Sequence, residues 1–124
     1  MAYLAAKNAA QALDFYVEVF GMTERYRLAM GEQIMHAELE YRGQVLMIAD
    51  EFPDMGVTGP ASLGGTSVSL AIEVDNTDAQ LKRCETAGCT VERRAKDEFF
   101  GVRGAVVIDP YGHRWFLQQY KERL

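Results

Sequence analysis

YLAAKNAAQALDFYVEVFG, residues 3–21, holds a short strand, a helix start, an amphipathic helix and a helix stop in one continuous stretch. Asn8 can cap a helix over residues 9–20, because its side-chain oxygen can accept a hydrogen bond from an unpaired backbone N–H. Gly21 stands where helices commonly end in a left-handed residue. Apolar side chains recur along this helix at spacings of three and four, which predicts one buried stripe. The stripe consists of Leu13, Tyr16, Val17 and Phe20.

The same order of strand, helix, strand and hairpin begins again near residue 67, so the chain contains an internal repeat. A repeat of about 60 residues with a fixed order of elements predicts one supersecondary unit used twice. We therefore expect a single domain, residues 1–124, made of modules 1–50 and 67–124 joined by a linker over residues 51–66. The matching positions are Leu4 with Leu70, NAAQAL (8–13) with NTDAQL (76–81), Gly21 with Gly88, and Gly43 with Gly112.

Alternating polarity predicts which side chains share a face of each sheet. Residues 33–41 alternate, and side chains two apart on a strand point to the same side. One face carries Met35, Ala37, Leu39 and Tyr41, and the other carries Ile34, His36, Glu38 and Glu40. In the second half we expect a strand over 67–74, a helix over 78–87, a short strand over 89–92, an aromatic loop over 98–104, and strands over 105–108 and 113–119.

Composition narrows the class of protein. The 124 residues carry a formal net charge of -5, which argues against nucleic acid as a partner because phosphate binding needs concentrated Lys and Arg. The densest basic cluster, Arg93-Arg94 with Lys96, is followed by acids, and we interpret it as a solvated loop. No apolar run approaches the length of a membrane-spanning helix, and the first residues lack the basic and apolar regions typical of a signal peptide. Cys84 and Cys89 lack a CxxC spacing, and we expect reduced thiols in a cytoplasmic protein.

The chain resembles the glyoxalase/bleomycin-resistance (vicinal-oxygen-chelate) superfamily, and within it the PhnB-like branch. The resemblance implies an α+β fold in which two βαβββ modules form a cupped mixed sheet with the helices outside and a ligand between the modules. It also implies that the chain pairs as a homodimer. The segments that carry it are YLAAKNAAQALDFYVEVFG (3–21), MHAEL (35–39), LMIADE (46–51), LGG (63–65) and FFGVRGAVVIDPYGHRW (99–115).

Members of this superfamily typically hold one divalent metal through four side chains, two from each module. Transferred to this sequence, the first position falls at or just before Met1, and the others fall on Met47, Ser69 and Phe116. A thioether is soft, a neutral hydroxyl is a weak ligand and a phenyl ring has no donor atom. We therefore predict no metal at these positions and no cofactor.

Two histidines offer acid–base chemistry. His36 shares a strand face with Glu38, and such a pair can move a proton or bind a metal, or can belong to a solvated polar face. If that face lines the cup, His36 is the best candidate for a catalytic general base. His113 shares a face with Trp115 and Leu117, so we expect it to be structural.

The other candidate ligand-binding residues lie mainly in the second module. Arg103 can clamp a carboxylate or phosphate or stack on a flat ligand, or it can pair with Asp97, Glu98 or Asp109 and fix its loop. An apolar and adaptable lining is expected from the remaining residues. With Arg103, the predicted ligand-binding residues are Glu38, Met47, Ser69, Phe100 and Phe116.

Three functions fit these observations. The leading hypothesis is a small-molecule-binding protein without the usual metal, which holds an apolar or aromatic ligand with a polar group toward Arg103 or His36. The second is a metal-dependent lyase or dioxygenase that uses His36 and Glu38. The third is a non-catalytic dimerisation module. The sequence alone does not decide whether the protein is an enzyme.

Overall fold

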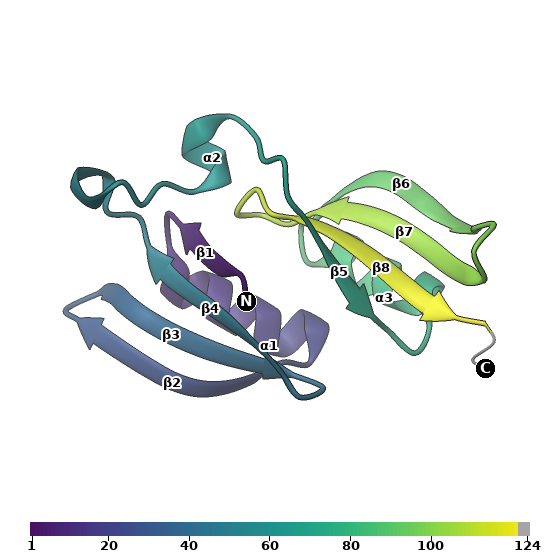
Figure 1. Ribbon diagram of the computed structural model, residues 1–124, viewed down its shortest axis with the longest axis horizontal. Helices are drawn as coiled ribbons and strands as arrows, with labels where there is room; N and C mark the ends of the chain where they lie inside the picture. Colours follow the sequence, from purple (N-terminus) through teal and green to yellow (C-terminus); the bar gives the residue numbers. More distant parts are fainter. Residues whose placement is uncertain (122–124) are drawn as a thin grey trace. The chain divides into compact units, whose positions relative to one another are not determined.

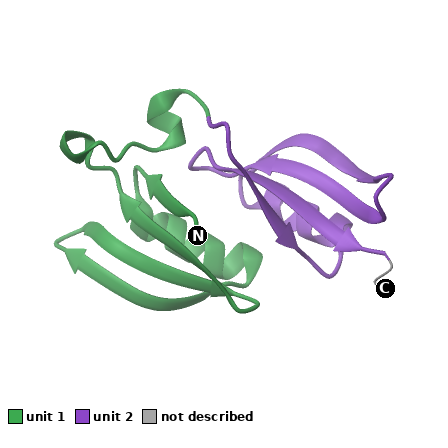
Figure 2. Cartoon of the chain, in the orientation of Figure 1, with its two compact units in different colours: residues 1–65 green, residues 66–124 purple. Residues whose placement is uncertain are grey.

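The computed structural model describes residues 1–121 and divides the chain into two compact units. Unit 1 comprises residues 1–65 and unit 2 comprises residues 66–124, so the predicted linker residues 51–65 belong to unit 1 (Figure 2). Each unit contains one four-stranded sheet and one helix of at least ten residues.

In unit 1 the sheet has the strand order β1-β4-β3-β2, with β1 parallel to β4 and the other pairs antiparallel (Figure 1). A 3-10 turn and one turn of α-helix follow the last strand. The elements are β1 (Tyr3–Ala6), α1 (Ala9–Phe20), β2 (Thr23–Met30), β3 (Gln33–Tyr41), β4 (Gln44–Asp50), η1 (Pro53–Met55) and α2 (Pro60–Leu63).

Unit 2 repeats this topology with the order β5-β8-β7-β6, and β5 is parallel to β8. The predicted α+β fold of two βαβββ modules is therefore confirmed. The elements are β5 (Ser69–Glu73), α3 (Thr77–Thr86), β6 (Thr90–Asp97), β7 (Val102–Ile108) and β8 (Arg114–Tyr120).

The two long helices begin in the same way. Asn8 accepts a hydrogen bond from the backbone N–H of Gln11, and Asn76 accepts one from that of Ala79, at 3.1 Å and 3.0 Å. Each cap satisfies one of the N–H groups that the first turn of a helix leaves unpaired. Helix α1 ends at Gly21 with φ 73°, as predicted.

Each helix buries its apolar side against one face of its own sheet. Leu13, Tyr16 and Phe20 are buried as predicted, but Val17 is exposed and Val19 is buried instead. The buried stripe of α1 is therefore rotated toward its alanines and Phe15. In unit 2 the corresponding core includes Leu81, Trp115 and Leu117.

One residue of β3 departs from the predicted alternation. Ile34 was expected beside His36 on the polar face, yet it is only 2% exposed, like Ala37 and Leu39 in the core. The pairing of β2 with β3 shifts register between Leu28 and Ala29, opposite this position. A shift of this kind inserts an extra residue and changes which side the following side chains take.

Two predicted loops contain regular structure. The basic cluster around Arg93 lies on β6, a full edge strand paired with β7, rather than in a loop or a short strand over 89–92. The aromatic loop is correspondingly shorter, since β7 starts at Val102. His113, Cys84 and Cys89 are buried, and both thiols are free.

Candidate functional site

The open face of each sheet, opposite its helix, is the face that can meet a ligand. In unit 1 the register aligns Met47 with Tyr3 on one side and Glu38 on the other, so the three side chains share the open face. In unit 2 the same relation aligns Phe116 with Ala71 and Val106.

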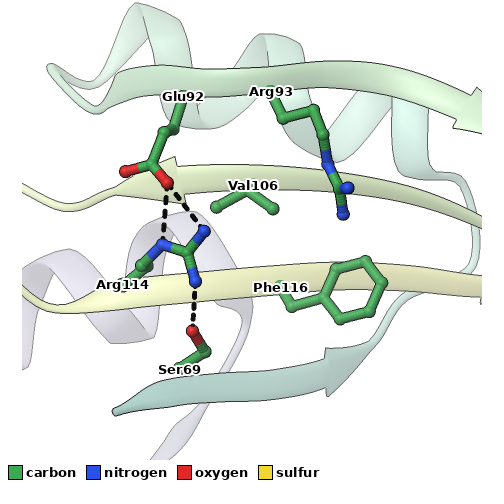
Figure 3. A pocket seen from close by; sticks show the side chains of 6 residues that line it. All are labelled: Ser69, Glu92, Arg93, Val106, Arg114 and Phe116. Atoms are coloured by element: carbon green, nitrogen blue, oxygen red, sulfur yellow. Dashed lines mark hydrogen bonds and ion pairs between the residues drawn. The ribbon is translucent and has the colours of Figure 1, made fainter. Parts of the chain in front are cut away.

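The open face of unit 2 is hollowed into a cavity of about 270 Å³ (Figure 3). Its floor contains the apolar side chains of Val106 and Phe116, on the neighbouring strands β7 and β8. Charged side chains stand around this floor. The lining residues are Ser69, Glu92, Arg93, Val106, Arg114 and Phe116.

Arg114 forms a fixed wall of the cavity. Its Nε donates to Glu92 Oε1 at 2.9 Å, and Nη2 lies 2.7 Å from the same oxygen. Its Nη1 donates to the hydroxyl of Ser69 (Figure 3). These contacts tie β5, β6 and β8 together and leave the Arg114–Glu92 pair neutral overall.

Phe116 lies between a cation and a second aromatic ring. The guanidinium carbon of Arg93 is 5.8 Å from the centre of the Phe116 ring, within cation–π range. The ring of Phe100, half exposed, meets Phe116 edge-on at 6.5 Å. Gly104 makes room for this arrangement, because a Cβ there would lie 2.5 Å from Phe116 Cε1.

Arg93 is held by charge rather than by hydrogen bonds. Its Nη2 lies 3.2 Å from Oε1 of Glu98, and the side chains are 44% and 10% exposed. Among residues 1–121, Glu98 Oε1 is buried without a hydrogen-bond partner. The N–H groups of Arg93 can therefore turn to an anionic ligand at the edge of the cavity.

The open face of unit 1 carries a hydrogen-bonded chain of three side chains. Tyr3 Oη lies 2.6 Å from His36 Nδ1, and His36 Nε2 lies 3.0 Å from Glu38 Oε2. Partial burial and the nearby Glu38 carboxylate raise the pKa of the Tyr3 phenol. Tyr26 lies beside the imidazole, with 6.0 Å between the ring centres.

The side chains at the usual metal positions do not fit a divalent ion. Met47 and Phe116 lie on the open faces but supply a thioether and a phenyl ring. The hydroxyl of Ser69 accepts from Arg114, so a cation there would meet a guanidinium. Within residues 1–121, no group of three or more His, Cys, Asp or Glu side chains gathers in a way that could hold a metal.

Arg103 lies outside the cavity. Its guanidinium binds Asp78 at 2.6 Å and 3.0 Å and Asp97 at 3.2 Å. The predicted alternative of pairing with Asp97 is thus observed, with Asp78 of α3 as a further partner. The hydrogen bonds from Arg103 lower the pKa of Asp78, and those from Lys121 and Arg103 lower that of Asp97.

The structure therefore brings together part of the predicted set. Ser69 and Phe116 line the cavity with Phe100 at its edge, whereas His36, Glu38 and Met47 share the open face of unit 1. Arg93 and Tyr3 also lie at these faces and were not predicted as site residues. Arg114, two residues before Phe116 on β8, lines the cavity as well, and the alternation of a strand is the signal that places both side chains on one face.

Comparison with known proteins identifies the superfamily to which this fold belongs. A sequence profile of the Glyoxalase/Bleomycin resistance protein/Dioxygenase superfamily matches residues 1–117. A Mycobacterium bovis protein, Mb0911c, is 38% identical over 122 residues, which cover 94% of this chain and 80% of that protein. Rv0887c of Mycobacterium tuberculosis is equally similar, with 71% of its length covered. Both relatives carry the description "uncharacterized".

Three solved structures have the same fold. TioX from Micromonospora sp. ML1 is 28% identical, with a TM-score of 0.74 and 97% of each chain covered. PA1353 from Pseudomonas aeruginosa is 23% identical, with a TM-score of 0.77 and coverage of 98% and 96%. TnmS3, an antibiotic binding protein from Streptomyces sp. CB03234, is 21% identical, with a TM-score of 0.69 and coverage of 95% and 91%. Over residues 1–121, no helix is long and apolar enough to span a membrane.

Proposed function

Because this chain belongs to the Glyoxalase/Bleomycin resistance protein/Dioxygenase superfamily, we propose that it binds a small aromatic molecule that carries an anionic group, without a metal at the usual position. The cavity on the open face of unit 2 is the observation that carries this proposal. The antibiotic binding protein TnmS3 shares the fold, which supports small-molecule binding in general terms.

The shape and chemistry of the cavity suggest the ligand class. A flat ring can cover the apolar floor of Val106 and Phe116 and meet the edge of Phe100. An anionic group on that ring then reaches Arg93, whose guanidinium already stands over Phe116. Both arginines face a carboxylate, Arg114 that of Glu92 and Arg93 that of Glu98. The guanidinium of Arg114 also donates hydrogen bonds to Glu92 and Ser69, so it is less free than Arg93 to turn to a ligand. A neutral ligand of the same shape should bind more weakly, because it cannot pair with Arg93.

Fluorescence titration with 1-naphthoate tests this proposal, with 1-naphthalenemethanol as the neutral probe of the same shape. We expect naphthoate to bind with a dissociation constant of about 10 μM to 1 mM, or roughly −4 to −7 kcal/mol. The neutral probe should bind about tenfold more weakly. Equal affinity for both probes, or binding of neither, would contradict the proposed site.

Two adjacent arginines provide a matched control. Arg93→Gln removes the cation that stands over Phe116 and should weaken naphthoate binding to the level of the neutral probe. Arg94→Gln removes the same charge one residue along β6, where the side chain pairs with Glu85 and does not line the cavity. That variant should keep the affinity of the wild type, and equal loss in both variants would indicate a general charge effect.

The sequence segments that resemble the PhnB-like branch lead us to propose that the chain belongs to that branch.

We also propose that the chain forms a homodimer. All eight residues of the edge strand β2 are exposed, and Tyr26, Leu28 and Met30 present apolar side chains there. An exposed edge strand offers unpaired backbone groups and is readily covered by a second chain. Sedimentation equilibrium at micromolar concentration should give twice the chain mass of 13.9 kDa, and a monomer would contradict the pairing.

A further inference from the structure

Glu98 stands in the turn between β6 and β7, where hydrogen bonds fix its backbone. Its N–H donates to the carbonyl oxygen of Val102 at 2.8 Å, and its own carbonyl oxygen accepts from the N–H of Gly101 at 3.4 Å. Gly101 adopts the left-handed backbone that the turn requires, with φ 83°. The turn therefore sets the direction of the Glu98 side chain, and only the carboxylate of this residue is left to meet a ligand.

The side chain of Glu98 lies at the Phe116 end of the cavity of unit 2. A Cβ on Gly104 would lie 3.3 Å from Glu98 Cγ and 2.5 Å from Phe116 Cε1, so both side chains pack over this one glycine. Glu98 Oε1 also lies 3.2 Å from Nη2 of Arg93, which lines the cavity. The carboxylate thus stands where the aromatic floor of the cavity meets its cation.

One oxygen of this carboxylate has no hydrogen-bond donor. The Glu98 side chain is only 10% exposed, and within residues 1–121 its Oε1 is buried without a hydrogen-bond partner. The contact with Arg93 compensates the charge but lacks the geometry of a hydrogen bond. A buried acceptor without a donor costs free energy, and the cost is greater for a charged group. A ligand that brings a donor to Oε1 removes this cost and gains affinity.

A ligand whose only polar group is an anion fits this end of the cavity less well. An anion that binds the guanidinium of Arg93 also approaches Glu98, because the two side chains are 3.2 Å apart. Two negative groups so close together repel each other, and the repulsion is stronger where water is partly excluded. A donor on the ligand, next to its anion, turns this repulsive contact into an attractive one.

We infer that the cavity of unit 2 selects an aromatic anion that carries a hydrogen-bond donor beside its anionic group, and that Glu98 accepts the hydrogen bond from this donor. The anion binds Arg93 while the ring covers Phe116. An amine next to a carboxylate suits this arrangement, because one N–H can bond the ligand's own carboxylate and the other can reach Glu98. The inference rests on the proposed function, since it assigns a specificity-determining residue to the same cavity.

Two probes of nearly equal shape test this inference on the full chain. 3-Amino-2-naphthoate and 3-methyl-2-naphthoate differ only in an amino and a methyl group, and the methyl group donates no hydrogen bond. Calorimetric titration of the wild type should show about tenfold tighter binding of the amino probe, because a hydrogen bond to a charged acceptor is a strong one. Equal affinity for the two probes, with both weakened by Arg93→Gln, would overturn this inference and leave the proposed function standing. Binding of neither probe would contradict the proposed function itself.

Glu98→Met keeps the length of the side chain and removes the charged acceptor. This variant should bind the two probes equally, and a preference for the amino probe that survives in it would overturn the role of Glu98. The comparison of the two probes on the wild type stands even if this variant fails to fold.

Asp97→Asn is the matched control for the loss of charge. It removes a negative charge one residue before Glu98, where the side chain pairs with Arg103 and Lys121 outside the cavity. Asp97→Asn should keep the preference of the wild type for the amino probe. An equal loss of this preference in Asp97→Asn and Glu98→Met would assign it to the charge of the turn as a whole and overturn the inference.

Discussion

The two units share a backbone plan but differ in what their open faces carry. The parallel and antiparallel registers align Tyr3 and Glu38 with Met47 in unit 1, and Ala71 and Val106 with Phe116 in unit 2. Two residues before Glu38 stands His36, and two residues before Val106 stands Gly104. The positions of the hydrogen-bonded side chains in unit 1 are thus occupied by small or apolar residues in unit 2.

This difference shows how one scaffold can carry two kinds of site. In unit 1, side chains with hydrogen-bonding groups fill the centre of the open face and contact one another. In unit 2, small side chains leave space there, and the ring of Phe116 lies over Gly104. The helix-facing sides, by contrast, are apolar in both units, since both must bury a helix.

The largest expected effect tests whether the two cores are equivalent. Leu39 of unit 1 and Leu117 of unit 2 are both fully buried on the helix side. Replacing either by Ala should lower the free energy of unfolding by about 2–5 kcal/mol, from lost apolar contact and the cavity left behind. Chemical denaturation of both variants measures this, and a loss in only one of them would show that the cores are not equivalent.

A smaller effect is expected where the open faces differ. Gly104→Ala places a Cβ against the ring of Phe116 and forces that ring aside. We expect a loss of about 1–3 kcal/mol in stability, typical of overpacking, together with weaker naphthoate binding. If Gly104→Ala left both stability and binding intact, this result would contradict the close packing of Phe116 over Gly104.

The helix caps should again be equivalent. Asn8→Ala and Asn76→Ala each remove one side-chain acceptor at the start of a helix. Each should lower the free energy of unfolding by about 1 kcal/mol. Asn8→Asp and Asn76→Asp are the controls, because a carboxylate can also accept this bond, and they should stay close to the wild type. A loss of stability in only one of the two alanine variants would show that the two caps are not equivalent.

The smallest effect concerns the ion pairs that Arg103 forms with Asp78 and Asp97 in unit 2. Arg103 lowers the pKa of Asp78, and Lys121 together with Arg103 lowers that of Asp97, so the stabilising contribution of Arg103 is present above their ordinary pKa of 3.8. It is lost as the pH falls through the lowered values. Arg103→Gln should therefore reduce the melting temperature slightly at neutral pH and not in strong acid. Thermal unfolding at both pH values measures this, and a difference that persists in acid would assign the effect to packing.

Local signals explain what the sequence could predict of the fold. The caps Asn8 and Asn76 and the stop at Gly21 act within a few residues, so both helices were predicted closely. Strand β6 was predicted too short because TVERRAKD has no apolar alternation. Its strand conformation depends on pairing with β7, and such non-local pairing cannot be deduced from the segment itself.

The same difference between local and non-local signals explains which site residues could be predicted from the sequence. Ser69 and Phe116 were identified through the repeat and the superfamily resemblance, and the alternation of β3 placed His36 beside Glu38. Tyr3 was missed because its contact with His36 spans 33 residues and depends on the order β1-β4-β3. Arg93 was missed because its cluster was interpreted as a loop. Which charged side chain turns toward a cavity depends on register, which shifts twice along β6.

The central claim is that the cavity of unit 2 binds an aromatic anion without a metal. The most direct measurement is titration with 1-naphthoate of protein treated with EDTA, repeated after addition of zinc, nickel or manganese, for the wild type and Phe116→Ala. The account predicts one binding constant for the wild type under all conditions and at least about tenfold weaker binding for the variant. Binding that appears only after metal is added, or that is indifferent to Phe116, would contradict it.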